Sequence, residues 1–147
     1  MNSKFGLNGD ELEMYSYGSP CAHQTPLFIL LATDYINAVK YIVGFTNDII
    51  DSMLKSEEWG DDLEKVNISL VDGSEVTQYG NYSLWSLYRG AIHIDYPDVM
   101  QSMHMALERT LLEFAKDDKY ANLVKDTFDY LLSRSKSVSL TAIVASV

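Results

Sequence analysis

Two histidine–carboxylate pairs come nearest to a chemical site in this 147-residue chain. His93 and Asp95 are separated by one residue, and His104 and Glu108 have the spacing that places two side chains on one face of a helix. Imidazole and carboxylate are ordinary ligands of catalytic transition metals. Neither pair matches an established signature, and no third ligand follows at a fixed spacing. We therefore expect these histidines to be solvated or at the edge of the core, and we predict no metal or other cofactor.

A nucleophile and a phosphate loop are also missing from the sequence. Cys21, the single cysteine, has His23 as a neighbour, but no glycine-framed turn presents its thiol, so we interpret it as an incidental thiol. One cysteine excludes an internal disulfide and a cysteine-based zinc site. None of the eight glycines precedes a lysine, and the spacing Gly-x-Gly-x-x-Gly does not occur. Standard nucleotide-binding loops are therefore excluded, and we predict that this segment is not an enzyme.

The charge balance narrows the class of partner. The chain has 21 acidic and 11 basic residues, a net charge of −10. A nucleic-acid groove needs clustered lysine and arginine, so we expect no nucleic-acid partner and no anionic membrane surface. The N-terminus lacks the apolar core of a signal peptide, and no apolar run reaches the roughly 18 residues of a membrane span. These features predict a cytoplasmic protein.

The segment QYGNYSLWSLYRG, residues 78–90, combines three tyrosines, a tryptophan and an arginine. If it forms one short helix, Trp85 and Arg89 lie one turn apart and the guanidinium reaches the indole face. We interpret Trp85, Tyr88 and Arg89 mainly as a joint that holds the fold, which predicts that Arg89→Lys lowers stability because lysine lacks the planar fork. The alternative is a partner-binding surface, since all three residue types are favoured anchors at interfaces.

The elements that must position these residues are predicted to be mostly helical. Residues 1–24 are polar, show no periodicity and are expected to be irregular, whereas residues 25–147 form a helical domain. Alternating apolar residues, then Asp72-Gly73, then a second short extended run predict a β-hairpin near 65–79. The fold class is therefore mainly α, a solenoid-like helical array with one inserted hairpin.

Apolar residues at three- and four-residue steps predict the helices. The series comprises a helix led by Pro26, a long helix over 34–56, a short helix ending at Gly90, a helix opened by Asp95 and Pro97, one from Tyr120, and a last helix after Ser135 or Ser137. We expect Asp34 to be the N-cap of the long helix. Gly44, in the interior of this helix, is expected to mark a close contact with another helix. Its predicted buried face comprises Ile36, Val39, Ile42, Val43, Thr46, Ile49, Ile50 and Met53.

The last helix, VSLTAIVASV, is apolar nearly all round, which is typical of a buried helix. We expect a further layer to cover it, as in helical repeat arrays. The chain is therefore predicted to be a piece of a longer protein that continues beyond residue 147.

Four segments together resemble a known family. QTPLFILLATDYINAVKYIVGFTN, QYGNYSLWSLYRG, MALERTLLEFAK and LLSRSKSVSLTAIVASV are similar, in this order, to a helical region of very large bacterial STAND-type P-loop ATPases of the antiviral kind. The similarity covers about residues 20–147. It implies a parent protein with an ATPase module and a helical array that senses a foreign protein. The phosphate loop is absent here, so no ATP-binding or catalytic residue carries over.

Three hypotheses about function follow. The first is a non-catalytic helical scaffold or sensor segment of such an ATPase, which acts in anti-phage defence through contacts with the parent chain, a foreign trigger protein or another copy. The alternative is a stand-alone acidic adaptor or immunity-type protein that masks a basic partner. The third is a metal-dependent enzyme built on His93, Asp95, His104 and Glu108.

Overall fold

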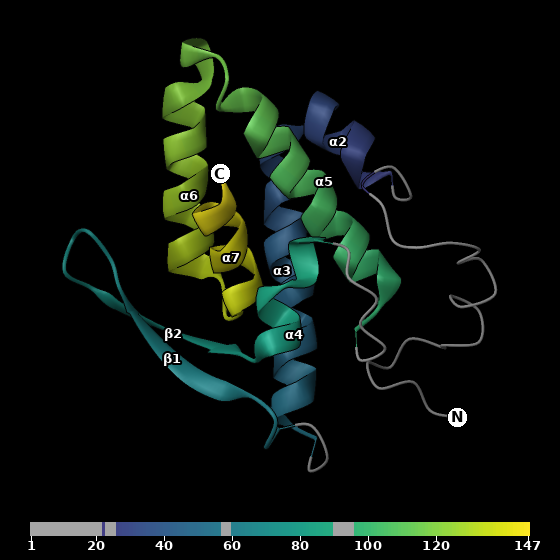
Figure 1. Ribbon diagram of the computed structural model, residues 1–147, viewed down its shortest axis with the longest axis vertical. Helices are drawn as coiled ribbons and strands as arrows, with labels where there is room; N and C mark the ends of the chain where they lie inside the picture. Colours follow the sequence, from purple (N-terminus) through teal and green to yellow (C-terminus); the bar gives the residue numbers. More distant parts are fainter. Residues whose placement is uncertain (1–21, 23–25, 57–59, 90–95) are drawn as a thin grey trace.

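The computed structural model describes residue 22 and residues 26–56, 60–89 and 96–147. This part of the chain is mainly helical with a single antiparallel hairpin, as predicted (Figure 1). The predicted irregular segment 1–24 lies outside the described residues apart from Ala22. The elements are α2 (Leu27–Thr33), α3 (Tyr35–Leu54), β1 (Glu64–Ser69), β2 (Glu75–Gly80), α4 (Tyr82–Trp85), a 3-10 turn (Leu87–Arg89), α5 (Asp98–Phe114), a 3-10 turn (Asp118–Tyr120), α6 (Ala121–Arg134) and α7 (Val138–Ser146).

The buried face of α3 follows the predicted periodicity with one exception. Seven of the eight predicted residues are buried, but Ile36 is 60% exposed. At this end of α3, Tyr35 and Ala38 face inward instead, and the Tyr35 hydroxyl lies 3.0 Å from Thr127 Oγ1 on α6. Because successive residues of a helix lie about 100° apart around its axis, Tyr35 on the inward side of the first turn leaves Ile36 turned toward solvent.

Of two further expectations for α3, one is confirmed and one is wrong. Asp34 is the N-cap residue, as predicted, although its carboxylate accepts hydrogen bonds from the Asn37 side chain (3.0 and 3.1 Å) rather than from a backbone N–H. Gly44 marks no close helix–helix contact, because a Cβ built on it meets no atom within 4 Å. Its side of α3 faces open space.

The hairpin forms where the alternation predicts it. Its strands pair without a bulge from Glu64↔Gly80 to Ser69↔Glu75. Gly73 closes the turn with φ +83°, a conformation that favours glycine, and its N–H donates to the Leu70 carbonyl (3.0 Å). Two strands alone are marginal in water, so the hairpin must be held by other elements.

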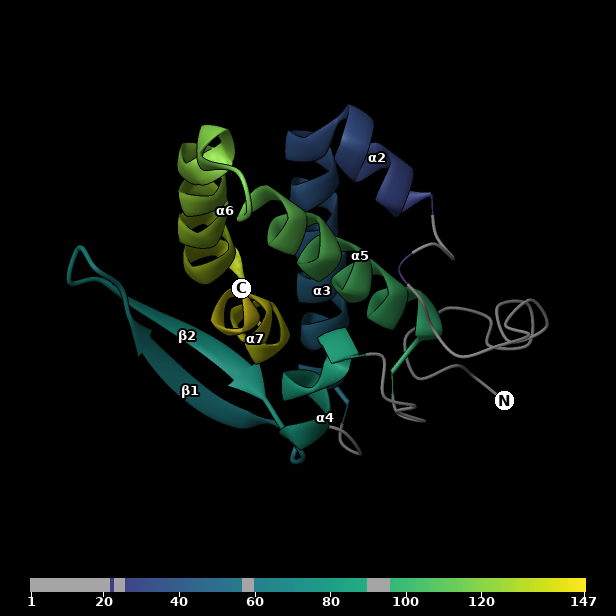
Figure 2. The ribbon, with the colours of Figure 1, turned by 45° about the horizontal axis from the view of Figure 1, so that its top comes forward.

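Strand β2 attaches the hairpin to the helices. The buried Gln78 side chain donates to the Leu132 carbonyl of α6 (3.3 Å) and accepts from Thr141 of α7 (2.6 Å). The Tyr79 N–H donates to the Lys136 carbonyl (2.7 Å). Strand β1 lies on the outer side, and Figures 1 and 2 show the hairpin reaching past α6 with its turn away from the helices.

Helix α7 occupies the centre of the domain. It contacts α4, α5, α6 and β2, and Leu140 and Ile143 are fully buried; Figure 2 shows it enclosed between these elements. Ser137 is its N-cap, as one of the two predicted alternatives, and accepts from the Ser139 N–H (3.2 Å). Elements of this chain cover its first turns, whereas Ala145 in the last turn is exposed. The further layer beyond residue 147 stays a prediction.

Helices α5 and α6 complete the helical domain. On α5 the predicted residues Met103, Leu107 and Leu111 are buried, whereas Val99 and Phe114 are only half-buried. The first turns of α5 are buried nearly all round, from Met100 to His104, because α5 passes between α2, the 3-10 turn that follows α4, and α7. No helix of the described residues is long and apolar enough to cross a membrane.

Candidate interaction surface

Of the two histidine–carboxylate pairs considered as weak metal candidates, only His104 and Glu108 lie among the described residues. His93 and Asp95 lie outside the described residues. His104 is 1% exposed, and its two ring nitrogens are occupied: Nδ1 lies 2.8 Å from the Met100 carbonyl oxygen and Nε2 2.9 Å from Ser139 Oγ. A carbonyl only accepts, so Nδ1 carries the proton and Nε2 accepts from the Ser139 hydroxyl. In the part of the chain that the structure describes, no three His, Cys, Asp or Glu side chains are grouped to hold a metal ion.

The His104–Ser139 contact has the spacing of a general base and a nucleophile, but not the access. Both residues are buried, and Ser139 Oγ is itself 2.8 Å from Ser137 Oγ. Burial lowers the pKa of His104 to about 4, so the imidazole is neutral near pH 7. The arrangement joins α5 to the first turn of α7, and we interpret it as a buried hydrogen bond that holds these two helices together.

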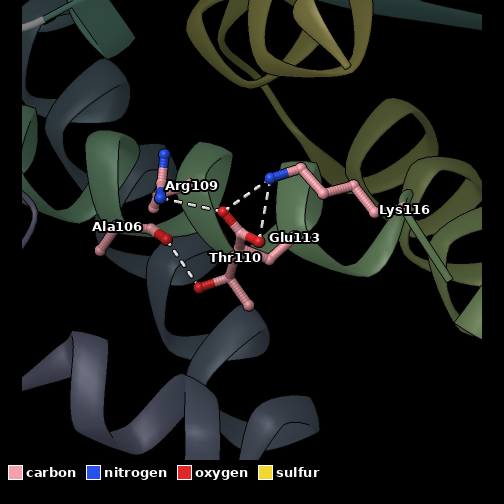
Figure 3. A network of polar contacts seen from close by, with 5 residues as sticks. All are labelled: Ala106, Arg109, Thr110, Glu113 and Lys116. Carbon is pink, nitrogen blue, oxygen red and sulfur yellow. Dashed lines mark hydrogen bonds and ion pairs between the residues drawn. The ribbon is translucent and has the colours of Figure 1, made fainter.

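Glu113 of α5 is engaged in ion pairs at the surface. Figure 3 shows Glu113 between Arg109 (2.9 Å) and Lys116 (3.0 Å), with all three side chains well exposed. The hydrogen bond from Lys116 lowers the pKa of Glu113, which keeps this carboxylate ionised. Nearby, the Thr110 hydroxyl donates to the Ala106 carbonyl (2.8 Å). Such a group is an exposed ion-pair acceptor and is not poised to donate a proton near pH 7.

An open depression of about 300 Å³ lies at the turn between α5 and α6. Phe114, Val124 and Phe128 form its apolar lining. Two of its three charged lining residues are paired, Asp117 with Lys119 (2.7 Å) and Lys125 with Asp129 (2.8 Å), and the third is Asp118. The depression therefore offers apolar contact with a charged rim.

The short helix α4 is fixed rigidly on its inner side. Asn81 caps it by accepting from the Leu84 N–H (2.9 Å) and donates through Nδ2 to the Tyr96 hydroxyl (3.1 Å). Leu84 and, in the following turn, Leu87 are fully buried. Gly80, just before the cap, lies so close to Val138 of α7 that a Cβ would overlap that side chain. These contacts hold the hairpin against the helices.

The outer side of the same segment carries the candidate site. Tyr82 is 83% exposed, Trp85 is 48% exposed, Arg89 is exposed and Tyr88 is half-buried. We call these four residues the aromatic surface. The predicted contact between Arg89 and Trp85 is not formed. Arg89 instead donates from Nε to the Tyr88 hydroxyl (3.0 Å), and its guanidinium carbon lies 5.5 Å from the centre of that ring.

The helix geometry explains this difference. The α-helix ends at Trp85 and the chain continues as a 3-10 turn at Leu87–Arg89, so the four-residue spacing no longer brings the Arg89 guanidinium onto the Trp85 ring. The bond to Tyr88 and the nearby phenol of Tyr82 raise the pKa of Arg89, which stays a cation. The predicted Trp85–Arg89 contact is therefore wrong, and the fully buried residues of this segment are Leu84 and Leu87, whereas Trp85 and Arg89 are exposed.

Sequence reasoning also missed a polar joint between α3 and the α6–α7 connection. Asn47 donates to the Arg134 carbonyl (2.9 Å) and accepts from the Lys136 N–H (2.8 Å). The Lys136 ammonium pairs with Asp51 (2.6 Å). Nothing in the sequence links Asn47 to a segment almost ninety positions away; the repeated serines at 133, 135, 137 and 139 were the only signal that this connection is unusual.

Comparison with known proteins adds no family to this description. No protein-family model matches the chain, and no curated protein matches it significantly.

Proposed function

We propose that this chain is a non-catalytic helical module that binds a protein partner through the aromatic surface. The observation that carries the proposal is the outward position of Tyr82 and Trp85 on a helix whose inner side is fixed by Leu84 and Leu87. Tryptophan, tyrosine and arginine dominate the binding energy of many protein interfaces. A rigid support means that little conformational entropy is lost when a partner orders them.

The chemistry of the surface indicates what the partner presents. Trp85 offers an apolar face, and among the described residues the Arg89 guanidinium donates only from Nε, which leaves its other donors for carbonyl or carboxylate acceptors of a partner. We propose a partner surface with an apolar side chain over Trp85 and an acceptor group at Arg89. The side chains of His104, Glu113, Asp117 and Asp129 are buried or paired. Because these four groups are engaged within the chain, they favour a binding role over a catalytic one.

The wider setting is proposed from the sequence resemblance alone. The four similar segments support a parent STAND-type ATPase, in which the aromatic surface contacts either another part of that ATPase or a foreign trigger protein. The stand-alone adaptor remains the alternative. The genomic reading frame discriminates between them, because a phosphate-loop module in the same frame supports the ATPase and its absence supports the adaptor.

A photo-crosslinking experiment tests the binding role. A photoreactive phenylalanine is placed at Tyr82 in the full chain, in the cells that produce it, and at Tyr41 as a control because that side chain is also exposed, on α3. We expect a protein adduct of one defined mass from position 82 that is absent from position 41. Trp85→Ser combined with Arg89→Glu should abolish this adduct without changing the melting temperature. An adduct that survives the double substitution, or none from position 82, contradicts the proposal.

A further inference from the structure

The outer edge of strand β1 presents unpaired backbone groups. The Leu70 N–H donates to the Ser74 carbonyl (2.8 Å), and the register runs from this pair along β1 without a bulge. Successive residues of a strand direct their N–H and C=O groups to opposite edges. The even-numbered residues therefore bond to β2, and Lys65, Asn67 and Ser69 direct theirs outward. All three are exposed, and none has another backbone partner within the described ranges.

This edge carries few of the features that usually protect one. Edge strands are commonly blocked by proline, bulges or inward-pointing charges, whereas β1 has six regular residues with no proline and only Lys65 as a central charge. The opposite edge of the hairpin, on β2, already pairs with an extended segment, because Tyr79 forms a parallel bridge with Ser137. The hairpin thus accepts an extended segment at one edge, and no described residue pairs with its other edge.

The side chains around the edge define the chemistry of a ligand. Val66, 38% exposed, and Ile68, half-buried, share the face that β2 turns toward the helices through Gln78. An added strand would therefore bury apolar side chains beside them. Residues 60–80 contain only one basic residue, Lys65, against five acidic ones, and all five are exposed: Asp61, Asp62, Glu64, Asp72 and Glu75. This charge favours basic side chains in the ligand.

We propose that the β1 edge binds an extended segment of a partner protein in which apolar and basic residues alternate, by antiparallel strand addition. A second copy of this chain fits less well. Antiparallel pairing of two β1 strands centred on Asn67 aligns Val66 with Ile68, but it also aligns Asp62 of one copy with Asp72 of the other, between molecules of net charge −10. This site is separate from the aromatic surface and does not depend on it.

The hydrogen-bond alternation makes a directional prediction for a synthetic probe, the capped peptide Lys-Val-Lys-Val-Lys-Val-Lys. Peptide residues opposite Lys65, Asn67 and Ser69 exchange hydrogen bonds with β1 and share their face, which is the face away from Val66 and Ile68. These are the lysines, whereas the valines direct their N–H groups away from β1. N-methylation of the central lysines should weaken binding at least about tenfold, and N-methylation of the valines should change it less than about twofold.

Titration calorimetry of the full chain measures these affinities, and amide shifts at residues 65–69 locate the site. Asn67→Pro should abolish binding, because it removes an outward N–H that β2 does not use, while Asn67→Thr should retain it. Trp85→Ser should leave the affinity unchanged, which separates this site from the aromatic surface. No binding at about 1 mM peptide, equal effects of the two N-methylated peptides, or equal binding of the Glu-Val counterpart would overturn the proposal. A dimer that dissociates on Asn67→Pro without peptide binding would also overturn it.

Discussion

The buried imidazole of His104 should make the stability of this domain depend on pH between about 6.5 and 4. The perturbation is protonation: both ring nitrogens are engaged as in a neutral imidazole, and burial lowers the pKa of His104 from 6.5 to about 4. In this interval the unfolded chain binds a proton at His104 and the folded chain does not. The contribution to stability is therefore complete above pH 6.5 and is lost as pH falls toward 4.

The magnitude follows from the two pKa values. A pKa difference of one unit between the folded and unfolded states corresponds to about 1.4 kcal/mol of unfolding free energy. The shift of the His104 pKa from 6.5 to about 4 is therefore worth roughly 3 kcal/mol. This is a large part of the 5–15 kcal/mol typical of a folded domain. Glu108, one turn along α5, has its pKa raised by burial, so its own contribution has the opposite sign and is lost as pH rises through that pKa.

Urea denaturation of the wild-type chain and of His104→Gln, at pH values from 7.5 to 4, isolates the effect. Glutamine does not titrate, and His23, His93 and Glu108 are present in both proteins, so their contributions cancel in the difference. We expect the wild-type advantage in unfolding free energy to shrink by roughly 3 kcal/mol between pH 7 and pH 4. A difference that stays constant over this range would refute the buried neutral imidazole.

Four other substitutions test separate features. Gly44→Ala should raise stability by about 0.5–1 kcal/mol in thermal denaturation, since an exposed helical glycine gains propensity without a clash, and a lower melting temperature would reveal a contact. Gly80→Ala should cost about 1–3 kcal/mol through overlap with Val138, and a neutral result would show that β2 can shift. Ser137→Ala should cost about 1–2 kcal/mol in urea denaturation through the lost cap, and an unchanged midpoint would rule the cap out. Arg89→Lys should leave the melting temperature unchanged, and a clear decrease would restore the joint that the sequence predicted.

Features that depend on neighbouring residues were predictable. The period of apolar residues located α3, α5, α6 and α7, because a helix that buries one side must repeat that side every three to four residues. Asp72-Gly73 located the hairpin turn, since glycine alone adopts its φ of +83° without strain. The predicted Ser137 cap also follows from local hydrogen bonding.

The candidate sites were less predictable because they depend on distant partners. His104 was recognised as an unlikely metal ligand, but its bond to Ser139 joins residues 35 positions apart. The predicted contact between Trp85 and Arg89 was wrong, and their role as a joint stays a prediction that Arg89→Lys tests. A change from α-helix to 3-10 geometry within one turn moved Arg89 onto Tyr88 and left the tryptophan facing solvent.

The sequence by itself determined the class of the fold, the positions of its helices and hairpin, and the absence of a phosphate loop, because each depends on residues within one or two turns of one another. Tertiary structure decided which surfaces remain open. Only the packing of α7 inside the domain, the attachment of β2 to α6 and α7, and the burial of Leu84 and Leu87 turn the aromatic surface and the β1 edge outward. Exposure depends on which distant segments cover a residue, and local periodicity carries no information about that choice.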